Sequence, residues 1–142
     1  PRPHKGVEDL LIALSLIKVS NLYVVIIGVD NQQKFMKEVD KSIRDRVLVL
    51  PKVYFDKLPE YLSAADILII PQRSTSDSIG QMPAKLYDAM AMAKPVLATR
   101  VSDIPEVLGN CGYLVNPGEP SKLGEAIQYI LDNHFQSCTL ES

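Results

Sequence analysis

The stretch PQRSTSDSIGQMPAKLYDAMAMAKPVLATR, residues 71–100, decides how the rest of the chain is interpreted. The apolar run DILII at residues 66–70 precedes it and is typical of a buried strand, which Pro71 ends. Residues 72–82 form a mostly polar loop that is longer than a minimal strand-to-helix connection. Loops of that length inside a compact domain more often carry function than not.

A helix is predicted from Ala84 to Ala93, followed by a strand at residues 96–98. Pro83 suits the first turn of a helix, and strong helix formers dominate after it. Three- and four-residue steps mark the buried face, at Leu86, Ala89, Met90 and Ala93. A polar loop that leads into a helix N-terminus favours phosphate, because free N–H groups and the helix dipole both attract an anion.

The remaining sequence continues the alternation of helices and strands. Helical spacing predicts helices at residues 7–19, 31–45, 58–65, 104–108 and 122–132, the last with Ser121 as its cap. Continuous apolar runs predict strands, buried on both faces, at residues 22–27, 46–50, 66–70, 96–98 and 112–115. This pattern indicates one α/β domain over residues 1–142, a doubly wound parallel sheet with its ligand crevice at the carboxyl ends of the strands.

Composition excludes several classes of function. The formal net charge is −2 and no basic stripe is present, so nucleic acid is not expected as a partner. No run approaches the roughly 18 apolar residues of a membrane span. Cys111 and Cys138 lack metal-ligand spacing and are predicted to be ordinary thiols. His4 and His134 are isolated, and no metal site is predicted.

Five ordered segments resemble one known family: KGVEDLLIAL, IIGVD, LPEYLSAADILIIPQ, MPAKLYDAMAMAKPVLAT and GYLVNPGEPSKLGEAI. Together they are similar to the C-terminal half of the retaining, GT-B-fold glycosyltransferases called group 1. In that family this Rossmann-like half binds the nucleotide-sugar donor, and a separate N-terminal half binds most of the acceptor. The resemblance implies that residues 1–142 are the donor domain and that the N-terminal acceptor domain is not in this chain.

Two residues take the catalytic roles that the resemblance implies. Lys5 matches the family lysine that pairs with the donor diphosphate, and the alternative is a solvated lysine at a helix start. Asp88 falls where the family has a glutamate that holds the donor ribose hydroxyls, although aspartate is one methylene shorter. Its alternative is a surface carboxylate favoured by the helix dipole. Arg2 is the candidate for the family's upstream arginine, with a short spacing to Lys5.

Further donor-binding candidates lie in the loop and beside it. Backbone groups of the loop would meet the diphosphate, at Ser78, Ile79, Gly80, Gln81 and Met82. Gly80 stands where the family often has a glutamate that contacts the donor sugar, a contact that glycine cannot make. Lys85 opposes the helix dipole, which indicates an anionic neighbour or a side chain in water, and Arg73 has the same two interpretations. Val53 either flanks the nucleobase or belongs to the edge of the core.

The resemblance implies retaining transfer of a sugar from a nucleotide diphosphate to a glycan, lipid or small-molecule acceptor. It implies no cofactor besides the nucleotide-diphosphate-sugar donor, and no metal. We expect a cytoplasmic enzyme, with peripheral association at the inner face of the membrane as an alternative. The departures at Gly80 and Asp88 keep a rival hypothesis, a degenerate module that binds a nucleotide or a partner protein. Epimerisation of a nucleotide sugar is a third hypothesis.

The family also has a central strand immediately before its Lys-Gly element. The chain begins at Pro1, after the position of that strand. We therefore expect the first strand of the sheet to be missing. We also expect the chain by itself to have no transferase activity.

Overall fold

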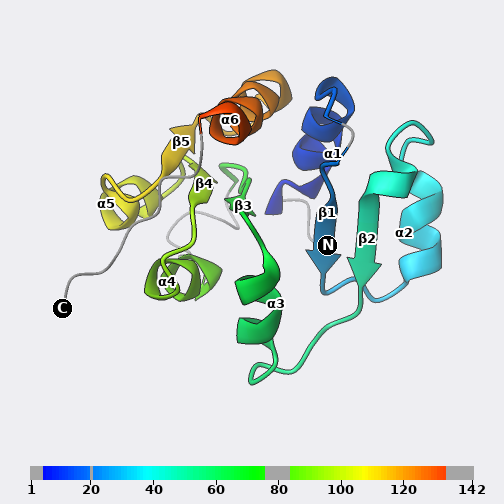
Figure 1. The fold of residues 1–142 in the computed structure, drawn as a ribbon, viewed down its shortest axis with the longest axis horizontal. Coiled ribbons are helices and arrows are strands. Elements are labelled where there is room, and N and C mark those ends of the chain that lie inside the picture. Colours follow the sequence, from blue (N-terminus) through cyan, green and yellow to red (C-terminus); the bar gives the residue numbers. More distant parts are fainter. Residues whose placement is uncertain (1–4, 20, 76–83, 134–142) are drawn as a thin grey trace.

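The computed structural model describes residues 5–19, 21–75 and 84–133 as an α/β fold with parallel strand pairs. Strands β1 (Val24–Ile27) and β2 (Val47–Leu50) form one sheet. A second sheet contains, in this order, β3 (Leu68–Ile70), β4 (Val96–Thr99) and β5 (Tyr113–Val115). Figure 1 shows helices on both faces of the second sheet. The predicted class, parallel sheet with helices on each side, is confirmed.

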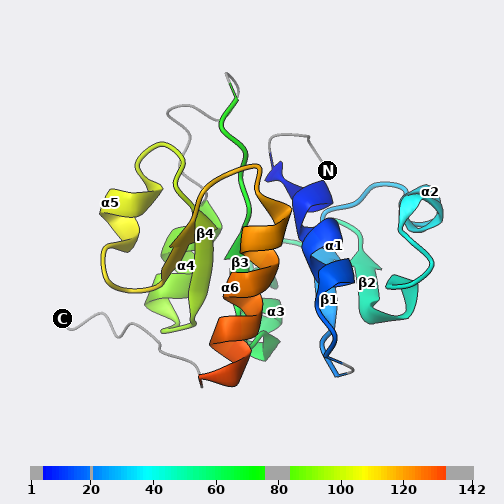
Figure 2. The ribbon, with the colours of Figure 1, turned by 90° about the horizontal axis from the view of Figure 1, so that it is seen from above.

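Six α-helices lie in the described ranges and cover these strands. They are α1 (Val7–Leu16), α2 (Gln32–Glu38), α3 (Leu58–Ala64), α4 (Ala84–Ala91), α5 (Ile104–Leu108) and α6 (Pro120–Asp132). Helices α1 and α6 lie side by side on one face of the three-stranded sheet (Figures 1 and 2), whereas α4 and α5 pack on its other face. The α1 and α6 pair therefore forms the layer opposite α4 and α5.

Helix α1 contributes to two apolar cores. Its Leu10 and Ala13 pack with α6 and with Leu97 of β4, in the core of the three-stranded sheet. Its Leu14 packs with Ile26 and Val47, in the core of the two-stranded sheet. Because one helix buries apolar area against both sheets, α1 joins them into one domain.

Strands β1 and β3 each have one edge that pairs with no described strand. The Leu68 N–H donates to Pro95 on the β4 side at 2.9 Å, so the peptide groups of Ile69 point away from β4. The Gly28 N–H donates to a carbonyl of β2 at 3.0 Å, so the groups of Ile27 point away from β2. The described strands therefore leave one edge of β1 and one edge of β3 unpaired.

We expect the amides of Ile27 and Ile69 to exchange with solvent about 100-fold faster than those of Gly28 and Leu68 in the chain of residues 1–142. The first two face open edges, whereas the other two donate across a strand pair. Amide hydrogen exchange followed by NMR measures all four positions in one sample. Equal protection at the four amides would show that another segment pairs with these edges.

Several predicted helix boundaries are wrong. The helix predicted at residues 7–19 ends at Leu16, and the one predicted from Ala84 to Ala93 ends at Ala91. The helix predicted at residues 31–45 ends at Glu38, where the Arg44 guanidinium donates to the Val39 carbonyl at 2.8 Å and caps the end of α2. Helix α6 begins at Pro120, so Ser121 lies inside the helix and is not its cap. Proline suits that first position because its missing N–H would have no helical partner there.

The predicted burial of both faces is wrong for β1 and β2. Val25 is 51% exposed and Leu48, its partner across the strand pair, is 54% exposed. Helices α1 and α2 pack on the opposite face of this sheet, against the neighbouring residues Val24 and Val47. An apolar strand face therefore remains accessible within the described part of the chain.

The prediction of two ordinary thiols is also wrong, because Cys111 is disulfide-bonded. The other cysteine of the chain, Cys138, lies outside the described residues. Cysteine spacing along a sequence does not by itself reveal pairing, and so it gave no indication of the bond.

Candidate functional site

The site begins at the turn Lys5–Gly6, which leads directly into α1. Gly6 has φ +71°, in the left-handed region, and an added Cβ would overlap the carbonyl oxygen of Pro71. Glycine alone satisfies both conditions, since it has no Cβ. This close approach holds the exposed Lys5 at the carboxyl end of β3, which is the edge where ligands bind in sheets of this type.

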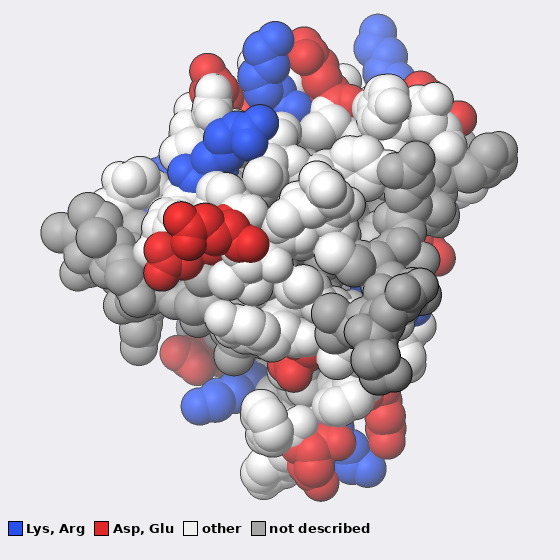
Figure 3. Space-filling view, turned by 90° about the vertical axis from the view of Figure 1, so that its left-hand side faces the viewer, with Lys and Arg blue, Asp and Glu red and all other residues white. Residues whose placement is uncertain are grey.

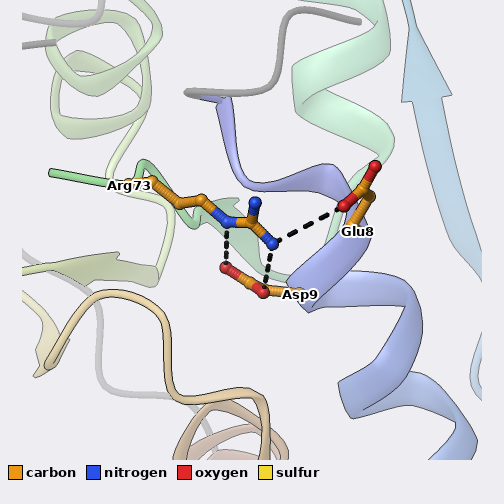
Figure 4. A network of polar contacts seen from close by, with 3 residues as sticks. All are labelled: Glu8, Asp9 and Arg73. Carbon is orange, nitrogen blue, oxygen red and sulfur yellow. Dashed lines mark hydrogen bonds and ion pairs between the residues drawn. The ribbon is translucent and has the colours of Figure 1, made fainter. Parts of the chain in front are cut away.

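Three charged side chains form a network beside this turn (Figure 4). Arg73, from the segment after β3, donates Nε to Asp9 Oδ2 at 2.9 Å and Nη2 to Asp9 Oδ1 at 2.7 Å. The same Nη2 lies 3.7 Å from Glu8 Oε2. Hydrogen bonding to Asp9 is the main cause that raises the pKa of Arg73 above its ordinary value. The network ties the first turn of α1 to the segment after β3.

The segment after β3 is also fixed from the side of β4. Thr99, at the end of β4, is buried, and its hydroxyl donates to the carbonyl oxygen of Gln72 at 2.6 Å. Gln72 is itself buried. Because α1 contacts Pro71 and Arg73 while β4 contacts Gln72, three successive residues at the carboxyl edge have defined positions.

The other predicted residues lie on separate elements. Asp88 is half-buried on α4, and Val53 is half-buried in the loop that follows β2. Among the described residues, no hydrogen bond or ion pair joins either one to Lys5. Several candidates fall outside what the structure describes and stay predictions: Arg2, Ser78, Ile79, Gly80, Gln81, Met82 and the side chain of Lys85.

Sequence reasoning missed Asp9. The available signal was its place in the first turn of a helix, where the dipole favours a carboxylate. That signal did not indicate a partner, because Arg73 lies 64 residues further along the chain. Only the folded chain brings the two together.

The described residues also bear on metal and membrane binding. They contain no group of three His, Cys, Asp or Glu side chains that could hold a metal ion. No helix within the described ranges is long and apolar enough to cross a bilayer. Among the described residues on the side drawn in Figure 3, acidic and basic side chains are scattered and form no continuous basic stripe. The described residues place one exposed ammonium group, that of Lys5, at the carboxyl edge of the sheet, where it suits an anionic ligand.

The fold is that of the Rossmann-like domains of GT-B glycosyltransferases, as comparison with solved structures shows. The chain belongs to the family described as glycosyl transferases group 1, whose family model matches residues 1–133. The family predicted from the five ordered segments is therefore confirmed.

Three similar proteins illustrate the relationship. An uncharacterized glycosyltransferase of Methanocaldococcus jannaschii is 29% identical over 141 residues, which are 97% of this chain and 38% of that protein. N-acetyl-alpha-D-glucosaminyl L-malate synthase of Bacillus anthracis is 38% identical over 96 residues, 66% of this chain and 23% of that protein. Anabaena HepE, solved in complex with UDP, aligns with a TM-score of 0.77 at 23% identity, over 93% of this chain and 37% of that one. The chain spans well under half the length of each.

Proposed function

We propose that this chain is the donor-binding domain of a retaining glycosyltransferase that takes a sugar from a nucleotide diphosphate. The observation that carries the proposal is the packing of Gly6 on Pro71, because this contact holds Lys5 at the carboxyl edge of the sheet. The chain's membership of the group 1 glycosyl transferases supports the same interpretation. A compact ammonium at that position suits a diphosphate. The complex of HepE with UDP supports a nucleoside diphosphate as the class of ligand.

In this proposal the domain acts by electrostatic stabilisation of the leaving group. The bond between the anomeric carbon and the diphosphate breaks, and the diphosphate keeps the electron pair. An acceptor hydroxyl oxygen bonds to the same face of the sugar, and the proton of that hydroxyl passes to the departing diphosphate. Lys5 and the amino end of α4 meet the growing negative charge on the diphosphate. Asp88 accepts hydrogen bonds from the ribose hydroxyls, and charge-assisted bonds of this kind contribute about 1.5–3 kcal/mol each.

The acceptor side of the reaction belongs to polypeptide outside this chain. The proposed acceptor is a glycan, a lipid or a small molecule, bound by an N-terminal domain of the complete enzyme. We place the enzyme in the cytoplasm, with peripheral association at the inner face of the membrane as the alternative. No protein cofactor is required, because the donor itself supplies the activated sugar.

Isothermal titration calorimetry with UDP-, GDP- and ADP-sugars tests the proposal. We expect one base class to bind with a Kd of about 1 μM to 1 mM, corresponding to about −8 to −4 kcal/mol. Absence of binding to all three by a folded chain would reject the donor site and favour the partner-binding module. Product analysis without an acceptor separates transfer from epimerisation, since only an epimerase would convert the donor into its epimer.

A further inference from the structure

We propose that Arg73 is a positioning residue, which through Asp9 holds the Lys5–Gly6 turn at the end of β3 and does not bind the donor diphosphate itself. The proposal rests on the proposed function, because it assigns a role within the same site. It replaces both interpretations that the sequence leaves open for Arg73, an anion-binding cation and a side chain in water.

The first argument is the geometry of the ion pair. Arg73 uses Nε and Nη2 to meet both carboxylate oxygens of Asp9, at 2.9 and 2.7 Å. A bidentate pair of this kind fixes the orientation of the guanidinium plane as well as its distance. Asp9 is 5% exposed, and a carboxylate withdrawn from water needs a charged partner. Nε and Nη2 of the Arg73 guanidinium are therefore both occupied by Asp9.

The second argument is that two contacts join the same two segments. The backbone of Gly6 packs on Pro71, and the side chain of Asp9 binds Arg73. Each pair has one member in the start of α1 and one in the segment after β3, as Figure 4 shows for the charged pair. Two attachment points restrain rotation of one segment on the other, and Lys5 is the residue next to the first point.

The third argument is the local charge. Glu8 Oε2 also lies 3.7 Å from Arg73 Nη2, so two described carboxylates face this one guanidinium. A diphosphate that approached Arg73 would meet two carboxylates close to one cation. Lys5 is exposed and forms no ion pair with the described carboxylates, so it is the better placed cation for a diphosphate.

The variant Asp9→Asn separates the two roles, because they predict opposite signs. Positioning predicts that nucleotide-sugar affinity, measured by calorimetry on the full-length protein, falls about tenfold, since small misplacements of a binding group are costly. Direct binding by Arg73 predicts that affinity rises, because a competing carboxylate is removed. Asp132→Asn is the matched control, which makes the same substitution at an exposed carboxylate at the end of α6 and is expected to leave affinity unchanged.

Two further measurements keep the test decisive. Arg73→Lys retains the charge but not the planar fork, so positioning predicts weaker nucleotide binding, whereas a simple phosphate cation would retain it. Without any nucleotide, the Leu10 amide, which donates to Gly6 at 3.2 Å, should exchange faster in Asp9→Asn than in wild type or Asp132→Asn. Wild-type protein that binds no nucleotide sugar would reject the proposed function, while this exchange result still decides on positioning. Unchanged Leu10 exchange, or tighter nucleotide binding by Asp9→Asn, would overturn the proposal.

Discussion

Replacing Gly6 with alanine is expected to destabilise the fold by about 2–5 kcal/mol. Left-handed backbone costs a residue with a Cβ about 1–2 kcal/mol, and forcing an extra carbon into a packed contact costs about 1–3 kcal/mol more. Both terms apply, because Gly6 has φ +71° and its Cβ would overlap the backbone oxygen of Pro71. The backbone has to move to relieve that overlap, and the Lys5 turn would move with it. Urea denaturation of wild type and variant measures the difference.

Gly118→Ala is the matched control. Gly118 has φ +72°, nearly the same as Gly6, but an added Cβ would have no atom within 4 Å. Only the conformational cost applies there, about 1–2 kcal/mol. The excess loss in Gly6→Ala therefore reports the contact with Pro71. Equal losses in the two variants would contradict the close approach of α1 to the end of β3.

The order and type of the elements could be predicted from the sequence, because buried parallel strands leave continuous apolar runs that are easy to recognise. The run at residues 66–70 and the helical spacing after Pro83 both correspond to observed elements, β3 and α4. Helix ends were harder to predict. The end of α2 depends on the Arg44 guanidinium, which folds back onto the Val39 carbonyl, and no local propensity indicates that bond.

The division into two sheets could not be derived from periodicity. Apolar runs show that strands exist, but they carry no information on which edges pair. The expectation of a missing central strand came from the family resemblance alone. Periodicity also could not predict which strand faces are buried. The run that contains Val25 is apolar throughout, yet one face of β1 is accessible.

The sequence supplies candidate residues for the site, which stay predictions, but not the contacts between them. Lys5 was singled out by its place before a glycine in a family element, and the structure explains the glycine by its approach to Pro71. The ion pair between Asp9 and Arg73 could not be predicted, because it joins residues distant in sequence and Arg73 lies in none of the five family segments. Sequence reasoning considered Arg73 as an isolated cation, whereas the structure pairs its guanidinium with Asp9.

Lys5 and Asp88 are expected to contribute most to donor affinity. Charge-assisted hydrogen bonds contribute about 1.5–3 kcal/mol, so Lys5→Ala and Asp88→Ala should each weaken binding of the nucleotide sugar about 10- to 100-fold. Lys18→Ala and Asp132→Ala are the controls. Each removes the same charge from an exposed position away from the candidate site. Lys18 follows the end of α1, and Asp132 is the last residue of α6.

Calorimetric titration of these four variants with the nucleotide sugar that wild type binds is the most direct test of a donor site at this edge of the sheet. The account predicts a loss of at least about tenfold in affinity for Lys5→Ala and Asp88→Ala, with wild-type affinity in Lys18→Ala and Asp132→Ala. Wild-type affinity in all four variants would contradict it, because the diphosphate and ribose would then be bound elsewhere.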